Sequence, residues 1–158
     1  DTVRAYLRNT TTPFAVVDSA KSIIDSVTFN GSFLFANAPT GAYYIQTKHR
    51  NALETWSKTG GESYTLGSAL NYDFTTDSAK AYGKNMKKAS AKWVFYEGDI
   101  NQDGFVELQD VILVNNASSA FLTGYVNTDV NGDRVVDLTD LIVTYNNSAG
   151  FVSKAVPN

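Results

Sequence analysis

Residues 99–110 read DINQDGFVELQD, and residues 129–140 repeat the pattern as DVNGDRVVDLTD. Both copies place oxygen-bearing side chains at positions 1, 3, 5, 9 and 12, and the carbonyl at position 7 can add a further oxygen. Because so many oxygens in one turn would repel one another, the spacing predicts that each copy surrounds a cation. Ca²⁺ accepts about six to eight such ligands, whereas Mg²⁺ prefers a stricter shell and keeps more water. The sequence therefore predicts two calcium sites.

The predicted ligands are the side chains at these five positions and the position-7 carbonyl of each loop. For the first loop they are Asp99, Asn101, Asp103, Phe105, Glu107 and Asp110, and for the second loop they are Asp129, Asn131, Asp133, Val135, Asp137 and Asp140. The alternative interpretation is a pair of Asx turns that cap two helices without an ion. The second loop has Arg134 at position 6, where a sharp turn favours glycine, so its occupancy stays open at the level of sequence.

Apolar residues recur at helical spacing after each loop. They are Leu108, Val111 and Ile112, followed by Asn115, and in the second copy Leu138, Leu141, Ile142 and Tyr145. This pattern predicts one helix after each loop, with Asp110 and Asp140 near the helix starts, where negative charge is favourable. Helices of about ten residues are marginal alone, so we expect them to pack antiparallel, with Val106 and Val136 pairing between the loops. The bound metal would supply part of the folding free energy.

Duplicated Asp-x-Asn-x-Asp loops that end in Asp and precede one helix resemble a dockerin, a small calcium-binding module with two loop–helix repeats. The resemblance covers residues 98–152, and it implies the same ten side chains as metal ligands and a cohesin-like protein as a partner. Cellulosomal dockerins often carry Lys or Arg on the helix face that meets cohesin. The sequence departs from that pattern, because the matching positions are Asn115, Asn116, Tyr145 and Asn146.

Charge is distributed unevenly along the chain. Residues 1–92 hold eleven basic and seven acidic residues, for a net charge of +4, whereas residues 93–158 hold two basic and nine acidic residues, for a net charge of −7. Two Ca²⁺ ions would bring the second value to −3, so the acidity is assigned to the metal sites and no nucleic-acid partner is expected. There is no cysteine, which excludes disulfides, and no apolar stretch of about 18 residues that would span a membrane. Weak calcium modules suit the extracellular medium, so we expect a secreted or cell-surface protein.

The first 97 residues read as short strands separated by turns. Residues 2–8 alternate, with Val3, Ala5 and Leu7 on one face, and further strands are expected at 14–18, 20–25, 70–75 and 92–97, with a helix or loop at 77–86. Residues 31–48, GSFLFANAPTGAYYIQTK, read as a hairpin and resemble carboxypeptidase-regulatory-like (transthyretin-like) sandwiches. The expected fold is a mostly β Ig/transthyretin-like sandwich over residues 1–97, followed by a small α dockerin-like module over residues 98–158.

These features favour a structural role over catalysis. Transthyretin-like sandwiches usually have a strand before the one that begins here, and its absence would leave a sheet edge open to a strand from another chain. Only Gly98 separates Glu97 from the first acidic loop, so no flexible linker is expected. We therefore expect a calcium-stabilised extracellular subunit that self-assembles into a bacterial surface fibre or layer, with strand addition as one route. No enzyme motif is present, and no enzymatic activity is expected.

Two other functions remain open at the level of sequence. The first is an anchor that binds a cohesin-like receptor. The second is a carbohydrate-binding module, in which Trp56 with Tyr64 or Tyr72 would stack on a sugar, although the same aromatic residues are also suited to fill a core.

Overall fold

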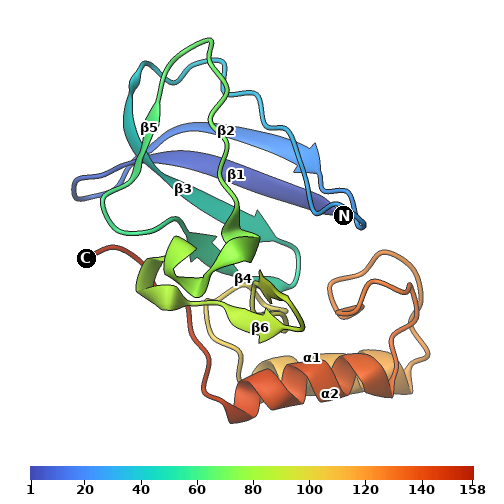
Figure 1. Cartoon of the computed structure of the whole chain (residues 1–158). Helices are drawn as coiled ribbons and strands as arrows, with labels where there is room; N and C mark the ends of the chain where they lie inside the picture. The colour runs from blue at the N-terminus through green and yellow to red at the C-terminus, as the bar shows by residue number, and fades with distance from the viewer. The chain divides into compact units, whose positions relative to one another are not determined.

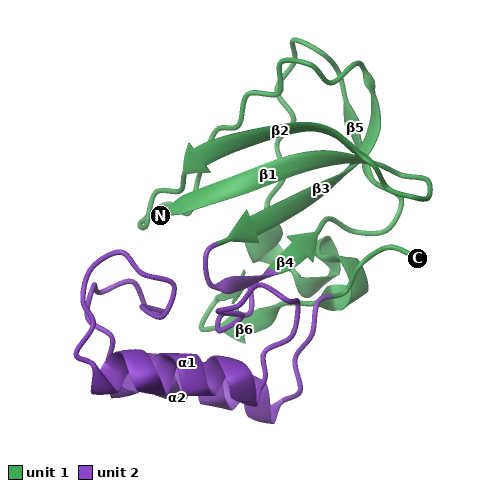
Figure 2. Cartoon of the chain, turned by 180° about the vertical axis from the view of Figure 1, so that it is seen from behind, with its two compact units in different colours: residues 1–49, 54–94, 155–158 green, residues 50–53, 95–154 purple.

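The structure, a computed structural model, describes residues 1–158 as a mostly β chain with two helices (Figure 1). This confirms the expected combination of a β part and a small α part. The chain divides into two compact units (Figure 2). Unit 1 comprises residues 1–49, 54–94 and 155–158, and unit 2 comprises residues 50–53 and 95–154. No sequence pattern indicated that residues 50–53 would belong to the same unit as the acidic loops.

Unit 1 is built on a five-stranded sheet with the order β2-β1-β3-β4, in which β5 also pairs with β3. The strands are β1 (Thr2–Asn9), β2 (Val16–Ile23), β3 (Gly41–His49), β4 (Ala52–Trp56) and β5 (Glu62–Tyr64), and the first two residues of β4 are assigned to unit 2. The predicted alternation of β1 is confirmed, because Val3, Ala5 and Leu7 are buried. Strand β1 pairs antiparallel with β2 along one edge and with β3 along the other. The prediction of an open edge at the first strand was therefore wrong: the strand at that end of the sheet is β2.

The predicted hairpin at residues 31–48 forms only in its second half, as β3. Residues 31–38 contain no strand, and at the end of the segment two backbone N–H groups have a side-chain acceptor instead of a strand partner. The Asp18 carboxylate accepts hydrogen bonds from the backbone N–H groups of Asn37, at 2.6 Å, and Ala38, at 3.1 Å. The bond from Asn37 is the main reason that the pKa of Asp18 lies below its usual range. A carboxylate on β2 thus replaces the strand partner that the sequence pattern suggested.

The other elements of unit 1 differ from the predictions in detail. The expected strand at 70–75 is replaced by a 3₁₀ turn, η1 (Phe74–Thr76), because the Asp73 side chain accepts the N–H of Thr75 at 2.8 Å and caps the turn. The segments expected at 14–18 and 20–25 form the single strand β2. The remaining elements are η2 (Ser78–Lys80), η3 (Tyr82–Lys84), β6 (Lys87–Ala89) and β7 (Lys92–Val94), of which β6 and β7 form a two-stranded sheet.

Unit 2 contains the two predicted helices, α1 (Leu108–Ser119) and α2 (Leu138–Ala149), which pack against each other. Its core consists of Ile100, Val114, Val130 and Val136. The buried face of α1 was predicted incorrectly, because Leu108 and Ile112 are 68% and 49% exposed. Asp110 and Val114, four residues apart, face inward instead, since Asp110 bonds to the loop backbone.

The two loop–helix repeats are joined by backbone pairing that the sequence did not indicate. The N–H of Val106 donates to the carbonyl of Val152, at 2.9 Å, and the N–H of Val136 donates to the carbonyl of Leu122, at 3.0 Å. Each loop is therefore bonded to the segment that follows the helix of the other repeat. Val106 and Val136 therefore do not form the expected backbone pair with each other; each is hydrogen-bonded to the segment after the other repeat's helix.

Candidate functional site

The aspartate at position 12 links each acidic loop to the start of its helix by hydrogen bonds from its side chain. In the first loop, Asp110 Oδ1 accepts the N–H groups of Ile100, at 2.8 Å, and Asn101, at 3.3 Å, while its Oδ2 accepts the N–H of Glu107, at 3.0 Å. In the second loop, Asp140 makes the equivalent bonds at 2.7, 2.9 and 3.0 Å to Val130, Asn131 and Asp137. Both aspartates are fully buried. Three of the roughly four lone-pair sites of each carboxylate are occupied by the backbone, which leaves one on Oδ2 for another ligand.

Positions 3 and 5 face each other in both loops. Asn101 Nδ2 donates to Asp103 Oδ2 at 2.8 Å, and the Asp103 N–H donates back to Asn101 Oδ1 at 3.0 Å. Asn131 and Asp133 repeat these two bonds at 3.0 and 2.8 Å. All four residues are exposed, so their oxygens are accessible from solvent. The same sequence spacing has produced the same local geometry twice.

The aspartate at position 1 of the first loop carries an unsatisfied charge. Asp99 is 2% exposed, and its Oδ2 accepts the Gly104 N–H at 3.2 Å, but its buried Oδ1 has no hydrogen-bond partner. A buried carboxylate oxygen without a partner is costly. Burial, reinforced by the negative charges of Asp110 and Asp103, raises the pKa of Asp99 to about 6. A cation beside Oδ1 would remove both the desolvation penalty and the repulsion.

The remaining predicted ligands are less well placed. The structure contains no preassembled group of three acidic or histidine side chains that could hold a metal ion. At position 9, Glu107 is exposed, and the Asp137 side chain accepts the N–H of Thr139 at 2.7 Å as a helix cap. At position 7, Phe105 and Val135 form isolated bridges to the segments after the helices. The set of candidate ligands still fits a hard cation, because every candidate atom is an oxygen and the buried Asp99 Oδ1 has no hydrogen-bond partner.

Both loops turn through the left-handed backbone region at positions 4 and 6. In the first loop these positions are Gln102, with φ 62°, and Gly104, with φ 92°. In the second they are Gly132, with φ 82°, and Arg134, with φ 72°. Each loop therefore has glycine at only one of the two positions that favour it. The backbone at Arg134 tolerates the non-glycine residue at a cost of about 1 kcal/mol.

Replacing Arg134 by glycine should relieve that strain. We expect Arg134→Gly to be about 1 kcal/mol more stable than Arg134→Ala, because both remove the same exposed side chain and only alanine keeps the left-handed penalty. Urea unfolding followed by circular dichroism at 222 nm provides the measurement. Equal midpoints for the two variants would show that the second loop does not adopt this backbone in solution.

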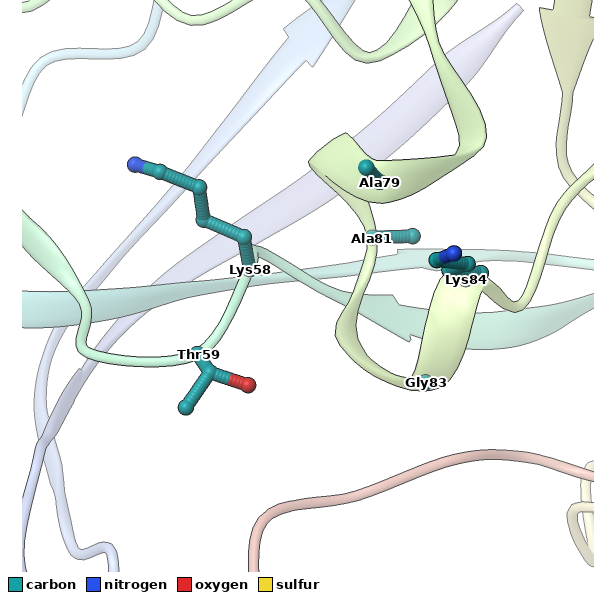
Figure 3. A pocket seen from close by; sticks show the side chains of 6 residues that line it. All are labelled: Lys58, Thr59, Ala79, Ala81, Gly83 and Lys84. Atoms are coloured by element: carbon teal, nitrogen blue, oxygen red, sulfur yellow. The ribbon is translucent and has the colours of Figure 1, made fainter.

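Unit 1 contains a hollow between the segment after β4 and the turns η2 and η3. This shallow hollow of about 340 Å³ is lined by Lys58, Thr59, Ala79, Ala81, Gly83 and Lys84 (Figure 3). The Lys58 ammonium points away from the turns that form this hollow and pairs with Glu62 at 2.6 Å. The alternative of a sugar-stacking platform at Trp56 is not supported, because Trp56 and Tyr64 are 5% and 8% exposed. These aromatic side chains fill the interior of unit 1.

Comparison with known proteins gives similarity in fold but no family. No protein-family model matches the sequence, and no curated protein matches it. Two similar solved structures are both of a type II cohesin–X–dockerin complex from Acetivibrio cellulolyticus, one a C-terminal and the other an N-terminal interface mutant. Their TM-scores are 0.53 and 0.54, their identities 16% and 19%, and each match covers 94% of this chain and 84% of the other. Identities this low show the fold alone.

The family resemblances drawn from the sequence are therefore corrected. The structural neighbours come from type II cohesin complexes and match along nearly the whole chain, and no family model supports a dockerin at residues 98–152 or a transthyretin-like sandwich at residues 1–50. The α-helical content is limited to two helices of 12 residues. Short Asp- and Asn-rich patterns arise from local turn chemistry as well as from descent, which is why they identify a family poorly. Neither helix has the length and apolar character that a membrane crossing requires.

Proposed function

We propose that unit 2 is a calcium-stabilised protein-interaction module of an extracellular protein, and that the chain acts by binding rather than by catalysis. The proposal of a calcium site rests on Asp99, whose buried Oδ1 has no hydrogen-bond partner and which belongs to a loop rich in oxygen-bearing side chains. The ligands would come from the twelve residues named above, six in each loop. One bound divalent ion in each loop would compensate the carboxylates that otherwise repel one another.

The interaction part rests on apolar side chains that both helices expose. Equivalent positions of the two repeats carry Leu108 and Leu138, at 68% and 64% exposure, and Ile112 and Ile142, both at 49%. Exposed large apolar side chains on a helix are suited to contact another molecule. The similar solved structures are of a protein complex, which supports a protein partner in general. A fibre built by strand addition at β1 has no such support, because both edges of that strand are paired.

Binding can be tested with the purified full chain against modules of type II cohesin–X–dockerin complexes, each immobilised separately. We expect binding that requires calcium and that weakens at least about tenfold in the double variant Leu108→Asp/Leu138→Asp, because the charges would be buried in the interface. Surface plasmon resonance with calcium and then with EDTA gives both comparisons. Sedimentation velocity at the same concentrations tests whether the partner is instead a second copy of this chain.

The matched control is Leu34→Asp, which makes the same change at an exposed leucine of unit 1. This variant should bind as the wild type does. Partner binding that persists in EDTA, or that falls equally in Leu34→Asp, would contradict a calcium-dependent site on the helices.

A further inference from the structure

Residues 50–53, which are the turn after β3 and the first two residues of β4, are hydrogen-bonded to the entrances of both acidic loops within unit 2. On the side of the first loop, the Asn51 carbonyl accepts the Gly98 N–H at 2.7 Å, and the Ala52 carbonyl accepts Gln102 Nε2 at 3.3 Å. On the side of the second loop, Asn51 Nδ2 donates to the carbonyl of Asp129 at 2.8 Å. A short segment from far upstream therefore touches both candidate metal loops.

Arg50 contacts the start of the second loop and the residues just before it. Its guanidinium donates to the carbonyl of Val126 and to the carbonyl of Asp129, the latter at 2.7 Å, and its Nη2 lies 3.5 Å from Asp129 Oδ2. It also lies over the ring of Tyr125, with 4.6 Å to the centroid. The side chains of Arg50 and Asp129 are only 10% and 2% exposed, so their charges interact with little screening by solvent.

The two loops consequently differ at their first aspartate. Each position-1 carboxylate uses one oxygen to accept a loop N–H: Asp99 accepts that of Gly104, and Asp129 accepts that of Gly132 at 2.9 Å. The second oxygen of Asp129 faces the Arg50 guanidinium, whereas the second oxygen of Asp99 has no hydrogen-bond partner. In the first loop, the side chain that reaches residues 50–53 is that of Gln102, and its amide group carries no charge.

We propose that Arg50 is a built-in counter-ion and positioning residue of the second loop, which holds the loop entrance in shape when no metal is bound. In the first loop no cation pairs with Asp99: the Lys154 side chain lies along Gly104 but forms no ion pair with the loop carboxylates. The first loop therefore depends on a bound ion for the same purpose. The inference rests on the proposed calcium function and extends it: the shape of the first loop should depend on bound metal more strongly than the shape of the second loop. It also makes residues 50–53 a required part of the two-loop module, although they lie 46 residues or more upstream of it in sequence.

The test compares equivalent amides of the two loops by NMR hydrogen exchange on the full chain in EDTA. We expect the Val130 and Asn131 amides to exchange at least about tenfold more slowly than those of Ile100 and Asn101, because only the second loop keeps its charge compensation. In Arg50→Ala this difference should disappear, through faster exchange in the second loop alone. Arg50→Lys, which retains the charge but not the planar fork, should retain part of it.

The control Arg4→Ala removes the same charge from an exposed side chain of unit 1 and should leave both loops unchanged. Equal protection of the two loops in the wild type would overturn the inference, and this comparison holds even if Arg50→Ala fails to fold. An Arg50→Ala variant that folds and keeps the wild-type difference would also overturn it. A parallel calcium titration by calorimetry tests the proposed function separately, because the exchange measurement is made without metal.

Discussion

Millimolar calcium should raise the melting temperature of the EDTA-treated protein by roughly 10 °C or more. An ion present at about 100 times its dissociation constant stabilises the folded state by about 2.7 kcal/mol per site, and two sites double that gain. In a chain of this size each kcal/mol corresponds to roughly 2–4 °C. The helix signal at 222 nm is the appropriate measurement, because both helices belong to unit 2.

Magnesium at the same concentration provides the control and should give a smaller shift, since it keeps more of its own water. The effect should also depend on pH. Asp99 must lose its proton to bind calcium, so the apparent affinity should fall as the pH is lowered through about 6. Without metal the sign is opposite: a raised pKa favours the protonated folded state, so this group's contribution to stability is lost as the pH rises through about 6. Identical melting in EDTA and in calcium would reject the proposed sites.

Asp110→Ala should destabilise unit 2 by about 3 kcal/mol or more. The substitution leaves three backbone donors without their acceptor, the buried N–H of Ile100 and the partly buried N–H groups of Asn101 and Glu107. An unsatisfied buried donor costs about 1–3 kcal/mol, and a partly buried one costs less. Relaxation of the loop and entry of water would recover part of that sum. Urea unfolding monitored at 222 nm, in calcium and in EDTA, would separate the backbone contribution from any loss of a metal ligand.

The matched control is Asp77→Ala, because that exposed aspartate accepts a single N–H, from Ala79 at 2.8 Å. Its loss should cost about 1 kcal/mol and should not depend on calcium. If Asp110→Ala had the wild-type urea midpoint of unfolding in both buffers, the hydrogen bonds of the aspartate at position 12 would have no role in stability.

The local part of the candidate site was predictable because it depends on side chains close together in sequence. Asn101 bonds to Asp103, two residues away, and Asp110 reaches back ten residues or fewer to the loop entrance. Such contacts follow from turn geometry and recur wherever the spacing recurs, which is why the second loop repeats them. The two helices were predictable for the same reason, as an apolar period of 3.6 residues is a local property.

Prediction failed where a partner from elsewhere in the chain decided the outcome. Residues 31–38 have the alternation of a strand, but Asp18 accepts the backbone N–H groups of Asn37 and Ala38. Strand β1 has two neighbours because β2 folds back onto it. The helix face was misjudged because Leu108 and Ile112 have the hydrophobicity of core residues, while the inward direction is set by Asp110.

The sequence alone determined where two oxygen-rich turns form and that a helix follows each, because these features depend on residues within about one turn of one another. Only the tertiary structure decided how the two loops differ. Arg50 lies 79 positions before Asp129, and nothing in the sequence between them indicates that the guanidinium meets the second carboxylate but not the first. Charge compensation depends on distance in space and on exclusion of water, and both arise only when the chain has folded.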